Sequence, residues 1–400
     1  MSELVAPSAQ DYLRHAFFSL HDAHILQPLP ESDARHAMLQ RYAPDSEHAH
    51  IEMLAPVDSS TSPMEKMLEA VQTNHWRQVA VIAGSCVSLP ADQNVPVTEA
   101  DLHCTLAWWH IRIISLSKMR LFTLLRKELN ALWTVLETVR IWDDQKQDIV
   151  PLVHASVVPF SLHVVHAQQL FLGGFQREGT ARLCRLTRMA ESMSQTESKN
   201  VWHIRAIRLR VLLASLLIET DQLPAATTVM VDLELSLRAK RIPDLSTLCM
   251  LMRLYLVMGN IQKARYILDE LHRVNPEPTP DTTARIETHE ALFHYMIRPH
   301  EPYDFPETVK SFEACTNNQA LTNTMALSAL LHGDIVQSVQ LLERILQEHP
   351  TVVASSTALT HNLLTLHSLG MRDAMEERKR VVQFLAQWAG DDGTWVNEGL

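Results

Sequence analysis

The chain has 400 residues, a length that fits two or three domains or one elongated array of repeats. Only 10 residues are glycine, well below the usual share of about 7%, which disfavours glycine-rich phosphate loops and folds with many left-handed turns. The formal net charge of −11 argues against broad electrostatic binding to nucleic acid or to an anionic membrane.

Residues 1–60 differ in composition from the rest of the chain. They are rich in proline and histidine, and we expect an irregular segment with short helices over residues 12–20 and 32–42. A polar run at residues 59–62 predicts a hinge before the first regular helix. The predicted organisation is therefore an N-terminal segment, 1–60, followed by a helical array over 61–400.

The next segments show apolar residues at helical spacing, in pairs separated by short turns. Residues 64–87 predict a helix pair that is broken at 74–76. A second pair turns at Arg120, with apolar residues three or four positions apart on both sides. An insertion is expected over residues 143–158.

Residues 149–176 contain no Asp, Glu, Lys or Arg, as a membrane span would require. Two prolines, three histidines and a pair of glycines interrupt the stretch, whereas a span needs about 20 predominantly apolar residues. We expect a loop to residue 158 and then a buried helix with Pro159 in its first turn. Further turns are predicted at Gly174 and Asp221, and the helix at 204–219 is apolar on nearly all sides, as a helix with neighbours on both flanks must be.

The clearest helix pair covers residues 244–276. Gly259 is placed to end the first helix, and Asn260 to cap the second. The same construction returns at residues 321–350, where Gly333 and Asp334 form the turn and the cap. A distorted pair is predicted between them, with helices at 283–297 and 306–314, and a last turn at Gly370.

Both clear pairs match the tetratricopeptide pattern, a helix pair of about 34 residues that stacks in series. In the first pair Tyr255, Gly259, Ala264 and Pro276 are the consensus residue types at their positions. The sequence therefore predicts an all-α fold, a tetratricopeptide-like superhelical solenoid of helix pairs.

Motifs that would mark an active site or a cofactor are missing from the sequence. There is no dinucleotide or nucleotide phosphate loop, no nucleophile elbow and no H-E-x-x-H pair. The five cysteines are at least 18 residues apart, which predicts reduced thiols in a cytosolic protein. His163 with His166, and His48 with His50, are incomplete as metal ligand sets. We therefore predict no catalytic, cofactor-binding or metal site, and no enzyme activity.

Several segments, in their order and spacing, resemble the C-terminal tetratricopeptide region of the subunit 12 family of the trafficking protein particle (TRAPP) complex. They are 118–122 (KMRLF), the run from 158 that begins VPFSLHVVHAQ, the turn in 323–342, and 360–369 (THNLLTLHSL). The resemblance covers about residues 60–395. Members of the family often carry a long low-complexity N-terminal region, whereas here about 60 residues precede the array.

The resemblance implies a non-catalytic subunit of a TRAPP III-type vesicle-tethering complex, which is an exchange factor for a Rab GTPase in ER-to-Golgi transport and autophagy. The expected partners are other TRAPP subunits and, indirectly, the Rab GTPase. The expected location is the cytoplasm, with only peripheral membrane contact through the complex. The alternative from another class is a tetratricopeptide adaptor that binds peptide tails, as co-chaperones do.

Four polar side chains on predicted first helices of the pairs are the candidate partner-binding residues. In tetratricopeptide arrays the first helices line the concave face, and the four are Gln168, Arg208, Arg253 and Asn323. Arg253 interrupts an apolar run, and an arginine there must reach solvent or a carboxylate because its unpaired burial is prohibitive. The alternative for Arg253 is an extended side chain that keeps only its charged end in water.

Overall fold

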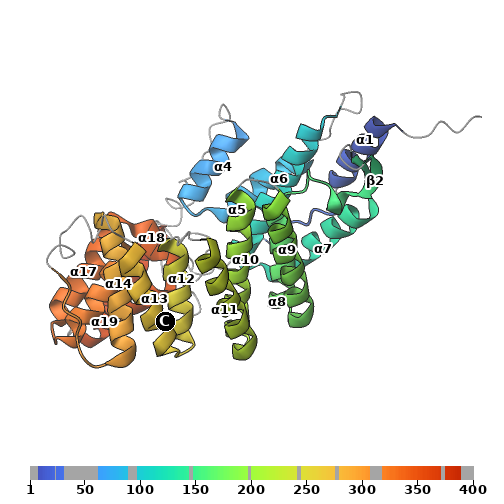
Figure 1. Cartoon of the computed structure of the whole chain (residues 1–400). Coiled ribbons are helices and arrows are strands. Elements are labelled where there is room, and N and C mark those ends of the chain that lie inside the picture. Colours follow the sequence, from blue (N-terminus) through green and yellow to red (C-terminus); the bar gives the residue numbers. More distant parts are fainter. Residues whose placement is uncertain are drawn as a thin grey trace, which may run out of the picture. The chain divides into compact units, whose positions relative to one another are not determined.

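The computed structural model describes residues 8–22, 24–30, 62–88, 97–143, 147–196, 200–240, 245–274, 279–306, 318–370 and 374–388 (Figure 1). The chain divides into two compact units. Unit 1 consists mainly of residues 1–169, and unit 2 mainly of residues 170–353 and 358–378. Almost every described element is an α-helix, and consecutive helices pack in pairs. The predicted all-α array of helix pairs is confirmed.

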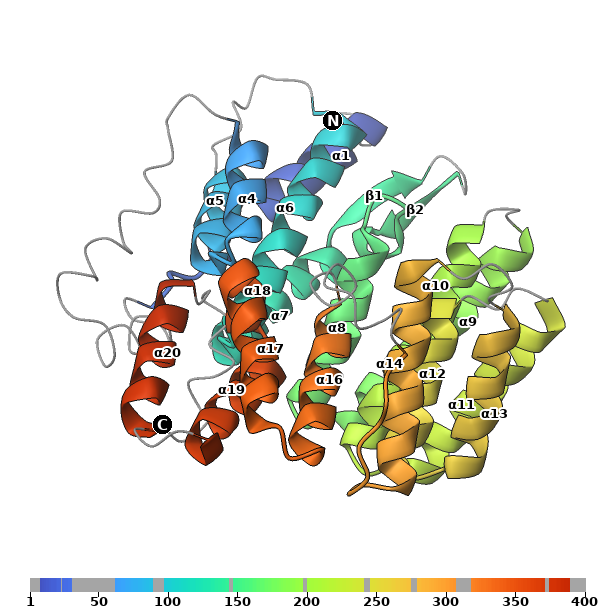
Figure 2. The same cartoon turned by 90° about the vertical axis from the view of Figure 1, so that its left-hand side faces the viewer.

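In the described residues, unit 1 contains five whole helices, one short hairpin and most of the helix that follows them, together with residues 354–357 and 379–388 from the C-terminal part of the chain. Its elements are α1 (Ala9–Leu20), α4 (Pro63–Gln72), α5 (Trp76–Ser88), α6 (Glu99–Lys118), α7 (Phe122–Thr138), β1 (Arg140–Asp143), β2 (Asp148–Pro151), the 3-10 turn η1 (Leu152–His154) and α8 (Phe160–Leu172). Helix α5 packs against α4 and α6, and α6 packs against α7. Figure 2 shows α4, α5 and α6 side by side.

Local sequence signals explain where several of these helices begin. Ser8 caps α1, Ser62 caps α4 and Thr98 caps α6, each with an acidic residue three positions later that bonds back to the cap. This capping box satisfies two backbone N–H groups that the first turn leaves without helical partners. Helix α1 covers the predicted 12–20 segment and packs on α6, α7 and β1, so this part of the N-terminal segment belongs to the core of unit 1.

The predicted loop before residue 158 is wrong in one respect. Strands β1 and β2 pair in antiparallel register, with Ile141 opposite Val150, and η1 follows directly. Ile141 is buried, and Val150 packs against the same core, which also contains the indole of Trp109. The strands have four residues each, which is too short to show a period-two pattern in the sequence.

Unit 2 continues the array of helix pairs. Its described helices, of which the division between the units cuts the last three, are α9 (Gln176–Thr196), α10 (Asn200–Glu219), α11 (Leu223–Lys240), α12 (Leu245–Val257), α13 (Ile261–Val274), α14 (Pro280–Ile297), α16 (Gln319–Leu331), α17 (Ile335–Glu348), α18 (Pro350–Ser355), α19 (Thr357–Gly370) and α20 (Ala374–Trp388). The pairs α10–α11, α12–α13 and α16–α17 each pack as a hairpin. The first helices α10, α12, α14 and α16 also contact one another in that order, as stacked repeats require.

The predicted turns of the array are confirmed at six positions, whereas Gly370, predicted as the last turn, is the final residue of α19. Gly259 and Gly333 have φ values of +69° and +85°, in the left-handed region that ends helices. Asn260 accepts the backbone N–H of Lys263 through Oδ1 (3.2 Å), and Asp334 caps α17 through Gln337 (2.9 Å). The turns at 74, 120, 174 and 221 also have positive φ.

Some predictions fall on residues outside the described ranges. These are the helices at 32–42 and 306–314, the boundary near residue 60, and the pair His48 and His50. Within the described ranges, no helix is both long and apolar enough to cross a membrane.

Candidate partner-binding surface

Each first helix in the middle of unit 2 shows one exposed stripe. On α12, Met250, Arg253 and Val257 are exposed, whereas the residues between them are buried or half-buried. The other sides of α12 contact α13, α10 and α14. The exposed stripe is therefore the side of α12 that faces none of these three helices.

Helix α10 has an equivalent stripe. Val201, Ile204 and Arg208 are exposed at helical spacing, while Arg205 lies over the Trp202 ring, 4.4 Å from its centroid. Arg210 has a different environment, because it pairs with Glu191 of α9 and donates to Ser236 of α11 (2.9 Å). Helices α10 and α12 contact each other, and we call their two exposed stripes together the first-helix surface.

The charge of Arg253 also affects a buried histidine on the neighbouring helix α14. His289 of α14 is buried, and its Nδ1 lies 2.6 Å from the carbonyl oxygen of Arg285. Burial lowers the pKa of His289, and the positive charge of Arg253 lowers it further, against the raising effect of backbone carbonyls. The positive charge of Arg253 therefore disfavours protonation of a side chain on α14.

Asn323, on α16, is half-buried and has a partner within unit 2. The Asn362 side chain donates through Nδ2 to its Oδ1 at 2.8 Å. The amide of Asn323 thus joins α16 to α19 and is less accessible than Arg208 and Arg253.

Gln168 lies on α8 in the part of the helix that belongs to unit 1. Its side chain is half-buried. The other three predicted residues, Arg208, Arg253 and Asn323, belong to unit 2. Nearby on α8, the ring of His166 stacks on Trp133 with centroids 3.6 Å apart, and the His163 ring meets the same indole edge-on. Burial, helped by His154, lowers the pKa of His163 to about 4. In the described part of the chain, no group of three His, Cys, Asp or Glu side chains could hold a metal ion.

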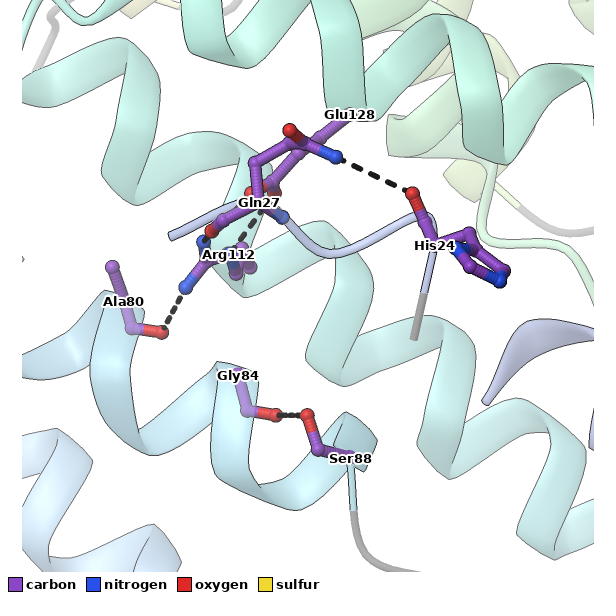
Figure 3. Close-up of polar contacts among 7 residues, drawn as sticks. All are labelled: His24, Gln27, Ala80, Gly84, Ser88, Arg112 and Glu128. Atoms are coloured by element: carbon purple, nitrogen blue, oxygen red, sulfur yellow. Dashed lines mark hydrogen bonds and ion pairs between the residues drawn. The ribbon is translucent and has the colours of Figure 1, made fainter. Parts of the chain in front are cut away.

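The sequence reasoning missed a polar cluster inside unit 1. Arg112 of α6 and Glu128 of α7 are 3% and 0% exposed and form a two-pronged ion pair, with Nε–Oε2 and Nη2–Oε1 distances of 2.9 and 2.7 Å (Figure 3). Arg112 interrupts an apolar run just as Arg253 does. That signal could have singled out Arg112, but it does not distinguish a buried arginine from an exposed one.

Two chain segments complete this cluster. Arg112 Nη1 donates to the carbonyl oxygen of Ala80 on α5 (2.9 Å), and Nη2 donates to that of Gln27 (2.8 Å). The backbone N–H of Gln27 donates to Glu128 Oε1 at 3.0 Å. The buried charges are therefore paired and hydrogen-bonded, which is the condition under which a protein interior tolerates them.

Among known proteins, nothing matches this chain: no family model, no curated protein and no solved structure.

Proposed function

We propose that this chain is a non-catalytic scaffold or adaptor subunit of a TRAPP III-type vesicle-tethering complex. In this role it would bind other TRAPP subunits and, through the complex, serve a Rab GTPase in ER-to-Golgi transport and autophagy. It would work in the cytoplasm, at the periphery of ER–Golgi membranes. The resemblance of residues 60–395 to the subunit 12 family supports the complex, and the first-helix surface supports the scaffold role.

The single observation that carries the scaffold role is the composition of the first-helix surface. Exposed aliphatic side chains lie beside exposed arginines on two helices in contact, with Ile204 next to Arg208 and Met250 next to Arg253. Arginine and methionine are enriched in protein–protein interfaces relative to the rest of the protein surface. Helix α12 has no acidic residue, so a complementary partner segment would carry carboxylates among apolar side chains.

Affinity purification from eukaryotic cells, followed by mass spectrometry, tests the proposal. We expect the tagged wild-type chain to recover TRAPP subunits. Recovery of none would end the trafficking proposal, and recovery of chaperones in their place would favour the peptide-binding adaptor.

A matched pair of double variants tests the surface. Arg208→Glu with Arg253→Glu reverses both charges of the first-helix surface, and we expect the loss of the recovered subunits. Arg185→Glu with Arg188→Glu makes the same change on exposed positions of the second helix α9 and should leave recovery unchanged. Circular dichroism checks that both variants stay folded. Equal recovery with the two variants would show that the first-helix surface does not bind these subunits, and would leave the proposed membership in the complex unaffected.

A further inference from the structure

Residues 26–30 run without helix or strand along three helices of unit 1. The segment follows the turn after α1 and contacts α5, α6 and α7. Figure 3 shows Gln27 of this segment beside Arg112 and Glu128, with Ala80 of α5 on the other side of the guanidinium. The segment is therefore bound by side chains of the helix array, as a separate peptide would be.

The hydrogen bonds that hold the segment go to its backbone. Glu128 accepts the N–H of Gln27, Arg112 donates to the carbonyl of the same residue, and Arg77 Nη2 donates to the carbonyl of Pro30 (2.6 Å). The Gln27 side chain donates to the carbonyl of His24, just before the segment (3.3 Å). Backbone contacts of this kind bind an extended chain with little regard to its side chains.

Two aliphatic side chains of the segment reach the core, and Ile25, directly before the segment, is buried in it. Leu26 and Leu29 are half-buried and pack against the unit 1 core, whereas Pro28 and Pro30 are exposed. Gly84 of α5 makes room for this arrangement. A Cβ at Gly84 would lie 2.9 Å from Arg112 Nη1 and 3.7 Å from the Leu26 side chain.

We propose that α5, α6 and α7 form a binding site for an extended peptide, which residues 26–30 occupy in cis. The ligand that fits is a segment from a partner protein with two aliphatic side chains three positions apart and a free backbone N–H and C=O on the residue after the first. Such a ligand supplies the same hydrogen bonds to Arg112 and Glu128 and takes the place of residues 26–30. The site is independent of the first-helix surface and goes beyond the scaffold role.

The requirement for a replacement ligand follows from the buried ion pair. If residues 26–30 left with nothing in their place, Arg112 and Glu128 would each lose a hydrogen bond in an interior position. The cis segment also competes as a tethered ligand at an effective concentration in the millimolar range. The apparent affinity for an added peptide is the intrinsic affinity multiplied by the fraction of molecules in which the site is free, so a mostly occupied site binds the peptide weakly.

The experiment measures binding of a fluorescent peptide with the sequence of residues 24–30 to the full chain. The double variant Leu26→Asp, Leu29→Asp removes both aliphatic anchors of the cis segment and leaves Arg112 and Glu128 intact. The control variant His24→Asp, Pro28→Asp adds the same charges at two exposed positions, one just before the segment and one within it. We expect the anchor variant to bind the peptide at least about tenfold more tightly than the wild type and the control do.

A second peptide tests the mode of recognition. Methylation of the Gln27 backbone nitrogen removes the donor to Glu128, and we expect this peptide not to bind the anchor variant. A folded anchor variant that binds neither peptide would overturn the proposal, as would equal binding of both.

If the anchor variant does not fold, hydrogen exchange of the wild type decides. We expect the Gln27 amide to exchange about a hundredfold or more faster than that of the buried Ile113 on α6, because the segment opens while the helices stay folded. Equal exchange rates at these two amides would show that residues 26–30 leave only with global unfolding, and would overturn the proposal.

Discussion

Glu128 is a carboxylate with no exposed surface that accepts three hydrogen bonds. Two come from Arg112 and one from the backbone of Gln27, so one side chain joins α6, α7 and the 26–30 segment. The net contribution of such a buried pair to stability is small, but loss of one partner is strongly destabilising, because the other charge then stays buried without a counter-charge.

Replacement of Glu128 by leucine should therefore be strongly destabilising. We expect Glu128→Leu to lower the free energy of unfolding by about 3–5 kcal/mol, since the Arg112 guanidinium stays buried without a counter-charge. Denaturant titration followed by circular dichroism measures this change. The double variant Arg112→Met, Glu128→Leu should recover part of the loss, because it removes both charges, although the Gln27 backbone and the Ala80 carbonyl lose their hydrogen bonds to these side chains.

The control for this prediction is on the same helix. Glu137 of α7 is exposed, and Glu137→Leu removes only its hydrogen bond from the Trp133 indole. A cost for Glu128→Leu no larger than that for Glu137→Leu would contradict the burial and pairing of Glu128.

At the scale of the element, the turns at Gly259 and Gly333 need glycine because their backbone is in the left-handed conformation. Gly259 lies between α12 and α13 with φ of +69°, and a Cβ added there would meet no atom within 4 Å. Space is thus not the reason for glycine at this position. The reason is the left-handed backbone conformation, which residues with a Cβ disfavour.

We expect Gly259→Ala to destabilise the protein by about 1–2 kcal/mol through backbone strain alone. Gly259→Asn should cost less, because asparagine tolerates the left-handed conformation at helix ends. Thermal unfolding of the two variants gives the order. An alanine variant as stable as the wild type would mean that the α12–α13 turn relaxes to a different backbone conformation.

These turns were predictable because their signals are local. Gly259 with Asn260, and Gly333 with Asp334, are adjacent residues whose conformational and capping preferences act over one turn of chain. The hairpin at 140–151 was not predictable, since its four-residue strands are stabilised by pairing and by contact of Ile141 with the core.

The candidate surfaces show the same division between local and distant causes. Arg253 and Arg112 both interrupt apolar runs, so the sequence marks each as a residue that needs water or a carboxylate. Which of the two is met depends on partners far along the chain. Arg112 has Glu128 on the next helix and Gln27 at 85 residues' separation, whereas Arg253 lies on the exposed stripe of α12. No local pattern contains that information.

At the scale of the whole molecule, charge is unevenly distributed. The chain has a formal net charge of −11, yet α10 and α12 together contain four arginines and one glutamate. Arg210 of these is paired with Glu191, while Arg208 and Arg253 are exposed. A local positive surface on an acidic protein favours a partner segment that carries negative charge.

The last prediction concerns the salt dependence of the partner interaction. If carboxylates of the partner meet Arg208 and Arg253 at an exposed surface, added salt screens the attraction, because the screening length falls to about 10 Å at about 0.1 M ionic strength. We expect the partner recovered with the wild type to be retained several-fold less at about 0.3 M than at about 0.05 M salt. The neutralised variant Arg208→Gln, Arg253→Gln should retain less partner at low salt and show little further loss at high salt. Quantitative mass spectrometry of the partner across the salt series measures both responses. Equal salt dependence in the wild type and in this variant would mean that the contact rests on the aliphatic residues of the first-helix surface, with no contribution from its arginines.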